Sequence, residues 1–207
     1  PAADAGYAYL ISFLPMSKFL LVGLGNIGPE YAGTRHNIGF DVLHTFVLKH
    51  KGTFEPERLA YVAEVKFKGK TIVCICPTTY MNLSGRAFKY WQEKARVPLE
   101  NTLTVVDDLA LPLDKIRLRP SGSDAGHNGL KDIQNILGTD KYPKLRFGIG
   151  NNYPRGMQAD FVLGKWRKEE ETQVKLKIEK CIEVIEMFFS AGIEQAMATY
   201  NNISVKP

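Results

Sequence analysis

The sequence predicts a single three-layer α/β domain, in which helices flank a twisted, mixed and mostly parallel sheet. Three observations lead to this fold class. Short apolar runs alternate along the chain with segments that have one apolar helical face. Most of these runs end at glycine or polar residues, as buried strands do. The chain has 207 residues, of which 44% are hydrophobic, and this is enough to bury one core.

The strands are predicted from the pattern of apolar residues. The first run is almost continuously apolar, which is typical of a strand covered on both faces. Lys68-Gly69 separates two runs of strand character and predicts a hairpin. Charged and apolar residues alternate between Lys115 and Arg119, as in a half-exposed strand. The expected strands are residues 18–24, 61–67, 70–76, 102–106, 115–119 and 145–149.

Helices are expected over residues 37–49, 83–95 and 127–137 and through most of the C-terminal third. In that third, apolar residues recur at helical spacing. Six basic and six acidic residues lie between Lys165 and Glu186, so we expect this helix to be a solvated lid rather than a basic arm. The apolar residues of this helix form one stripe, which comprises Val174, Ile178, Cys181, Ile185 and Phe188 or Phe189.

The first fifteen residues are set apart from this domain. They hold an apolar stretch but lack the basic start and cleavage site of a secretory signal, and the stretch is too short to span a bilayer. We interpret residues 1–15 as a non-native or upstream tail and residues 16–207 as the domain, with Met16 as the natural start. Since no other targeting or membrane signal is present, we expect a cytoplasmic protein with no membrane partner.

Net charge and cysteine content bear on three classes of protein: those that bind polyanions, those held by disulfides and those that bind metal through cysteines. The net charge of +5 and pI near 9.0 favour a polyanionic partner such as RNA, though only weakly. The odd number of cysteines, in apolar surroundings, argues against a disulfide framework. Cys74 and Cys76 could form half a metal site. No second pair has the required spacing, so we expect them to pack in the core.

Gly23-x-Gly25-x-x-Gly28 follows the first strand and matches the dinucleotide-binding fingerprint. A nucleotide-dependent oxidoreductase is therefore one alternative. It requires an acidic residue at the end of the second strand and a helix directly after the third glycine. Neither is found, because residues 29–34 intervene and Asp41 falls within a predicted helix. We expect no nucleotide cofactor.

His36 and Asp107 are the candidate catalytic residues. Asp107 ends a predicted strand, and the loops that follow neighbouring strands open on one edge of an α/β sheet, where they form the ligand crevice. A carboxylate that orients a neutral imidazole makes it a general base for activating water. Three amides, of Asn26, Asn82 and Asn128, would hydrogen-bond carbonyls and an oxyanion in the same crevice.

Five motifs resemble those of bacterial-type peptidyl-tRNA hydrolases. The resemblance extends from about Lys18 to Tyr200, nearly the whole domain, with order and spacing preserved. Ile27, Val106 and Ala110 depart from the residues that are common in that family. The motifs are Gly-Leu-Gly-Asn at 23–26, Thr-Arg-His-Asn-Ile-Gly at 34–39, Tyr-Met-Asn-Leu-Ser-Gly at 80–85, Asp-Asp-Leu with a following Leu-Pro at 107–112, and Gly-His-Asn-Gly-Leu at 126–130.

The resemblance implies an enzyme that hydrolyses the ester bond between peptide and tRNA without metal or cofactor. His36 would be the catalytic base and Asp107 its orienting partner. Substrate would be bound by Asn26, Tyr31, Tyr80, Met81, Asn82 and Asn128. Arg117, Arg119 and Arg146 lie in a stretch, 115–146, with a net charge of +4, and would contact tRNA phosphates. We expect a monomer whose partner is peptidyl-tRNA. The alternative within this fold is a catalytically silent RNA-binding relative such as a splicing factor.

Overall fold

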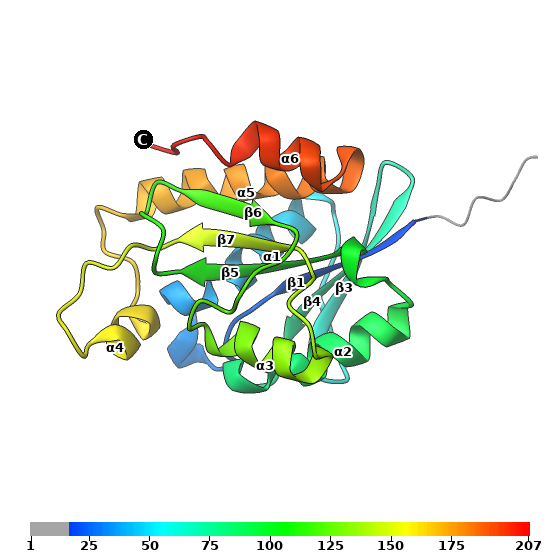
Figure 1. The fold of residues 1–207 in the computed structure, drawn as a ribbon, viewed down its shortest axis with the longest axis horizontal. Helices are drawn as coiled ribbons and strands as arrows, with labels where there is room; N and C mark the ends of the chain where they lie inside the picture. Colours follow the sequence, from blue (N-terminus) through cyan, green and yellow to red (C-terminus); the bar gives the residue numbers. More distant parts are fainter. Residues whose placement is uncertain (1–16) are drawn as a thin grey trace, which may run out of the picture.

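A seven-stranded sheet runs through the centre of the molecule (Figure 1), in the order β2-β3-β4-β1-β5-β7-β6. The computed structural model describes residues 17–207. The strands β4, β1, β5 and β7 are parallel, whereas β3 and β6 run antiparallel to them. The predicted mixed, mostly parallel sheet is confirmed. The strands are β1 (Lys18–Gly23), β2 (Glu55–Glu57), β3 (Ala60–Phe67), β4 (Lys70–Pro77), β5 (Thr102–Asp108), β6 (Ile116–Arg119) and β7 (Lys144–Gly148).

Helices cover both faces of the sheet and complete the three layers (Figure 1). Helices α1, α5 and α6 pack on one face, and α2 and α3 on the other. Successive side chains of a strand point to opposite faces, so Leu21 joins the core under α1 and α5 while Leu20 joins the core under α2 and α3. The helices are α1 (Ile38–Lys49), α2 (Ser84–Ala95), α3 (Asn128–Leu137), α4 (Gln158–Leu163), α5 (Glu171–Ala191) and α6 (Ile193–Tyr200).

Two local features show how sequence sets this geometry. Lys68 and Gly69 both have positive φ, of 46° and 73°, as a two-residue hairpin turn between β3 and β4 requires. At the start of α1, a Cβ on Gly39 would lie 2.4 Å from the backbone of Leu24. Glycine therefore lets α1 begin directly against the end of β1.

The predicted elements agree with the observed ones, with three exceptions. The strand expected at 102–106 continues to Asp108. The short elements β2 and α4 were not predicted. The expectation that the long C-terminal helix is a solvated lid was wrong, because α5 packs its predicted apolar stripe into the core. The expected tail, residues 1–15, lies outside the described residues.

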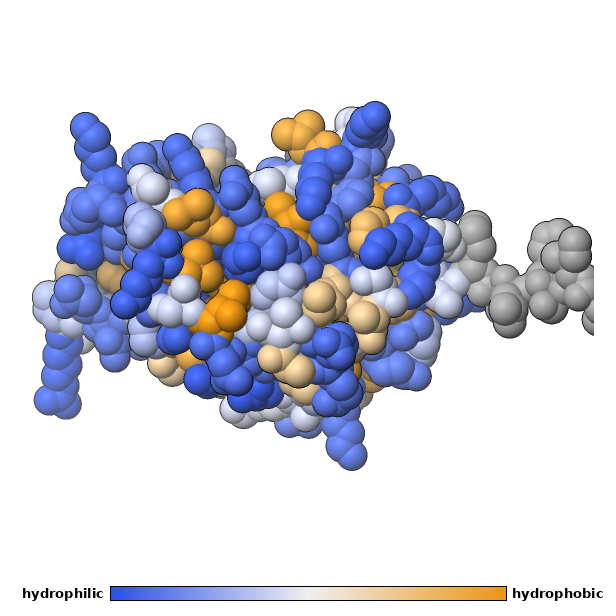
Figure 2. All heavy atoms as spheres, turned by 90° about the horizontal axis from the view of Figure 1, so that it is seen from above, coloured by the Kyte–Doolittle hydropathy of each residue, from blue (hydrophilic) through white to orange (hydrophobic). Residues whose placement is uncertain are grey.

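The surface over α5 and α6 is mixed in character. Figure 2 shows this face with hydrophobic side chains scattered among hydrophilic ones. Among the described residues, no helix is both long and apolar enough to cross a membrane. The three cysteines are free and buried, in accordance with the prediction that they pack in the core.

Candidate active site

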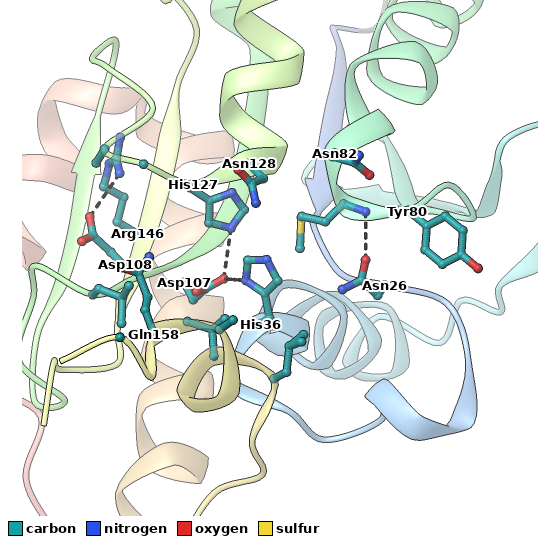
Figure 3. A pocket seen from close by; sticks show the side chains of 18 residues that line it. Asn26, His36, Tyr80, Asn82, Asp107, Asp108, His127, Asn128, Arg146 and Gln158 are labelled. Atoms are coloured by element: carbon teal, nitrogen blue, oxygen red, sulfur yellow. Dashed lines mark hydrogen bonds and ion pairs between the residues drawn. The ribbon is translucent and has the colours of Figure 1, made fainter. Parts of the chain in front are cut away.

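Three segments bring their polar side chains together at the carboxyl edge of the sheet (Figure 3). His36 lies in a short 3-10 helix, Arg35–Asn37, between β1 and α1. Asp107 is the next-to-last residue of β5, and His127 is the N-cap of α3. All three residues are buried, each at most 9% exposed. They line a cavity of about 630 Å³.

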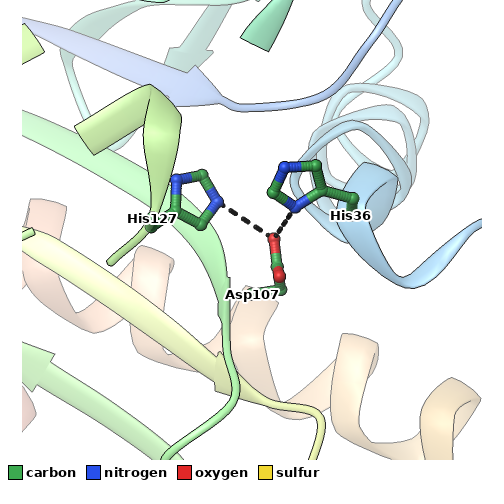
Figure 4. Close-up of side chains that lie close together, drawn as sticks. All are labelled: His36, Asp107 and His127. Carbon is green, nitrogen blue, oxygen red and sulfur yellow. Dashed lines mark hydrogen bonds and ion pairs between the residues drawn. The ribbon is translucent and has the colours of Figure 1, made fainter. Parts of the chain in front are cut away.

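Asp107 is bonded to both histidines through one oxygen atom (Figure 4). Its Oδ1 lies 2.8 Å from His36 Nδ1 and 3.0 Å from His127 Nε2. Because the carboxylate oxygen accepts, both ring nitrogens donate. His36 therefore carries its proton on Nδ1, and when neutral it leaves Nε2 unprotonated. This is the tautomer that a general base needs.

His127 is held in one tautomer by the backbone of α3. Its Nδ1 accepts hydrogen bonds from the N–H groups of Gly129 (3.2 Å) and Leu130 (3.3 Å). A nitrogen that accepts carries no proton, so the proton of this imidazole is on Nε2 and points at Asp107. His127 thereby acts as a neutral helix cap and as a donor to the carboxylate.

The two histidines determine the charge of Asp107. Burial by itself would raise the pKa of this carboxyl, but the nearby His127 and His36, with their hydrogen bonds, hold it well below its ordinary value. Asp107 is therefore ionised at neutral pH. An ionised carboxylate at hydrogen-bond distance stabilises the imidazolium that forms when His36 takes up a proton.

The same three side chains form a group of potential metal ligands, with ligand atoms within 4.8 Å of one another. Both imidazoles, however, direct an N–H group at the shared carboxylate oxygen. A metal between them would have to replace these hydrogen bonds, and His127 has its other nitrogen occupied by α3. The donor set therefore fits a hydrogen-bonded array better than a metal centre.

Asn26 is fixed at the end of the cavity that lies away from Asp108 and Arg146 (Figure 3). Its Oδ1 accepts a hydrogen bond from Met81 N, at 2.8 Å. Its backbone is held by the side chain of Asn37, which accepts from Asn26 N and donates to Asn26 O, both at 2.9 Å. With the amide oxygen occupied in this way, Nδ2 is the group that can donate to a ligand.

Several of the other predicted substrate residues also line this cavity. These are Tyr80, Met81, Asn82 and Asn128. Asn82 and Asn128 are exposed, and neither amide makes a hydrogen bond within the described part of the chain. Tyr31 lies in the short helix Pro29–Tyr31 and is not among the residues that line the cavity.

The predicted phosphate contacts differ in their surroundings. Arg117 and Arg119 are exposed on β6, an edge strand. Arg146 is only 7% exposed. Its guanidinium donates to Asp108 Oδ2 at 3.1 Å and to Ser123 O at 2.5 Å, at the far end of the cavity from Asn26 (Figure 3). Arg146 thus lines the cavity, but two of its N–H donors are already bonded to Asp108 and Ser123.

Helix α4 forms one wall of the cavity and is attached through Arg35. Gln158, Ala159, Val162 and Leu163 contribute to that wall. Arg35 Nη1 donates to the carbonyl of Lys165 at 2.7 Å, and Arg35 N donates to Gly164 O at 3.0 Å. The guanidinium carbon lies 4.3 Å from the ring centre of Phe161. The residue next to His36 therefore holds the segment that covers the site.

Sequence reasoning missed His127, Asn37 and Arg35. Each lies inside a motif that was noticed, but nothing in the local pattern indicated what it contacts. A signal was present for His127, because a polar residue directly before a predicted helix is an N-cap candidate. Its bond to Asp107, twenty positions away, could not be inferred from that signal.

The fold and the site together define an α/β protein with a buried histidine–aspartate pair beside an open cleft. Comparison with known proteins gives the family. The profile of the peptidyl-tRNA hydrolase family matches residues 20–207. A peptidyl-tRNA hydrolase of Parabacteroides distasonis is 50% identical over 185 residues, which cover 89% of this chain and 99% of that relative. The chain belongs to the peptidyl-tRNA hydrolase family.

Two further similarities agree with this assignment. A peptidyl-tRNA hydrolase of Porphyromonas gingivalis is 45% identical over 184 residues, or 89% of this chain and 100% of that relative. The crystal structure of peptidyl-tRNA hydrolase from Acinetobacter baumannii has a TM-score of 0.86 at 30% identity and covers 92% of this chain and 98% of that one. The match thus extends to the arrangement of the elements.

Proposed function

We propose that this protein hydrolyses the ester bond that joins a peptide to the terminal ribose of tRNA, with His36 as general base. The observation that supports this proposal most directly is the 2.8 Å hydrogen bond from His36 Nδ1 to Asp107 Oδ1. It leaves Nε2 as the proton acceptor in a side chain that lines the cavity. Family membership supports the same reaction.

In the proposed reaction, water attacks the ester carbonyl while His36 Nε2 takes one of its protons. The carbonyl oxygen becomes an oxyanion. Amide donors of Asn26, Asn82 and Asn128 are available to stabilise it, together with the N-terminus of α3. When the tetrahedral intermediate collapses, the ester C–O bond breaks and the imidazolium returns its proton to the departing ribose oxygen, which becomes a hydroxyl. The products are free tRNA and the peptide acid, which releases its proton to water and becomes a carboxylate.

We assign the tRNA to the side of the cavity where Arg146 lies. Arg117 and Arg119 are exposed on the neighbouring strand, where Arg117 is paired in register with Arg146. Phosphate oxygens are recognised by Arg side chains at such positions. We further expect the protein to act as a monomer in the cytoplasm, which gel filtration and cell fractionation test.

A direct assay tests the proposed function. The protein is incubated with an N-acetyl-aminoacyl-tRNA, and free tRNA is measured against time. We expect release by the wild type and its loss in His36→Ala. The alternative, a catalytically silent RNA-binding relative, predicts tRNA binding without release. The retained His36–Asp107 pair favours the enzyme, because RNA binding alone has no use for an oriented base.

A further inference from the structure

A second cavity, of about 500 Å³, has Asn26 in its lining but neither His36 nor Asp107. Asn26 contributes to both cavities, so they are neighbours. The walls of the second cavity come from the loop after β1, from α1, and from β3 and the end of β4. The residues that line it are Asn26, Ile27, Gly28, Ala32, Gly33, Asn37, Phe40, Asp41, His44, Phe54, Tyr61 and Cys76.

Aromatic rings and one carboxylate dominate this lining. Phe40, Phe54 and Tyr61 come from three different parts of the chain. The ring of His44 lies edge-on to Phe54, with centroids 5.1 Å apart. Among residues 17–207, Asp41 is the only acidic residue in the lining, and no Lys or Arg lines the cavity. Aromatic faces combined with a carboxylate are a suitable environment for an organic cation.

The Asp41 carboxylate has no partner among the described residues, with neither a hydrogen bond nor an ion pair to its side chain. Burial raises the pKa of Asp41 to about 6. Neither His44 nor Cys76, which also line the cavity, compensates its charge. Burial lowers the pKa of His44, and burial raises that of Cys76, so both favour their neutral forms. A bound cation would supply the missing counter-charge.

The orientation of the bound substrate would place part of its peptide in this cavity. This step rests on the proposed function. Arg146 lies at one end of the catalytic cavity and Asn26 at the other, with His36 between them (Figure 3). If the tRNA phosphates lie on the Arg146 side, the peptide leaves the ester towards Asn26. Its preceding residues then reach the second cavity.

We propose that the second cavity is a specificity site for a lysine or arginine side chain of the substrate peptide, upstream of the esterified residue. The alkyl stem of such a side chain packs against Phe40, Phe54 and Tyr61, and its charged end pairs with Asp41. Discrimination of this kind selects among peptides without changing the reaction at His36.

The experiment compares N-acetylated tripeptidyl-tRNAs in which the esterified residue is alanine. One of the two preceding residues is lysine, norleucine or glutamate, and the other is alanine. We expect lysine, in one of the two positions, to give a kcat/KM about three- to tenfold higher than norleucine, with glutamate lowest. Asp41→Asn should remove the advantage of lysine over norleucine. Glu100→Gln, which removes an exposed charge outside both cavities, should preserve it.

The outcomes separate the two proposals. Equal values for lysine and norleucine in the wild type, or a preference for norleucine, would overturn the cation site even if Asp41→Asn failed to fold. A lysine preference that persists in Asp41→Asn would also overturn it. If the wild type hydrolysed none of the three substrates, the proposed function itself would fail. The inference alone fails if all three are cleaved at the same rate.

Discussion

Arg35 and Glu170 form a buried ion pair, with Nη2 and Oε2 2.7 Å apart and both side chains at most 7% exposed. The pair joins two segments 135 residues apart in the sequence. One segment carries His36, and the other follows α4 and begins α5. Together with the carbonyls that Arg35 binds, this pair attaches the α4 wall of the cavity to the turn that carries His36.

The first prediction concerns this ion pair. Arg35→Lys should lower the free energy of unfolding by about 2–4 kcal/mol, because lysine cannot form the planar set of bonds that arginine makes and Glu170 loses a buried partner. KM should rise as the α4 wall loosens. Denaturant titration and steady-state kinetics measure both effects. Arg155→Lys, the same substitution at an exposed position in the loop between β7 and α4, is the control. Equal stability of the two variants would contradict the prediction.

The second prediction tests the base. His36→Ala should lower kcat by about 10²–10⁴-fold with little change in KM, because proton transfer occurs only in the transition state. Single-turnover assays on an N-acetyl-aminoacyl-tRNA measure this effect. His50→Gln, which alters a histidine beyond the end of α1 and outside both cavities, is the matched control. Wild-type turnover in His36→Ala would refute the assignment.

The third prediction concerns Asp107. Asp107→Asn should reduce kcat less than His36→Ala does, because the base itself is kept. The acidic limb of its pH–rate profile should move to lower pH, since the imidazolium loses its anionic neighbour. The neighbouring histidines keep the pKa of Asp107 well below its ordinary value, so this limb does not report Asp107. Superimposable profiles for the two proteins would contradict the proposed pair.

The fourth prediction concerns stability and pH at Asp41. Its pKa in the folded protein, about 6, lies above the ordinary value of 3.8, so the unfolded chain releases this proton first as pH rises. Folding therefore loses stability between about pH 4 and pH 6 and changes no further above that range. Asp41→Asn removes this loss and should be more stable than the wild type by about 1–2 kcal/mol at pH 7, after allowance for partial exposure. Thermal unfolding at pH 4 and pH 7 measures the difference. An equal gain at both pH values would count against it.

The fifth prediction concerns the exposed arginines of β6. Arg117→Ala with Arg119→Ala should raise KM for peptidyl-tRNA and make the salt dependence of KM shallower. With fewer phosphate contacts, fewer counterions are released from the tRNA on binding. Turnover at saturation should change little. The control is Lys168→Ala with Lys175→Ala, which removes the same amount of charge from exposed positions outside β6. An unchanged salt slope in the β6 variant would mean that the phosphates bind at another surface.

The local pattern of the sequence determined most of the fold. Apolar runs predicted the buried strands, because a parallel sheet covered by helices excludes polar residues from both of its faces. Lys68-Gly69 predicted the hairpin, because its turn needs positive φ at both residues. The position of Asp107 at the end of a predicted strand, on the edge of the sheet where the loops form the crevice, predicted that it orients His36. The strands and the hairpin depend on neighbouring residues in the chain, so the sequence alone predicts them, whereas the pairing of His36 with Asp107 also required the general geometry of α/β sheets.

Only the tertiary structure decided which distant groups meet. Asp107 contacts a second histidine, His127, through the placement of α3, and Arg35 meets Glu170 through the path of the C-terminal segment. The short helix α4 has too few turns to show an apolar period, and the role expected of the C-terminal helix was wrong because its stripe is buried in the core. The environment of Asp41 likewise depends on β3, α1 and the loop after β1 packing together. Such contacts depend on the packing of whole elements, which no local period encodes.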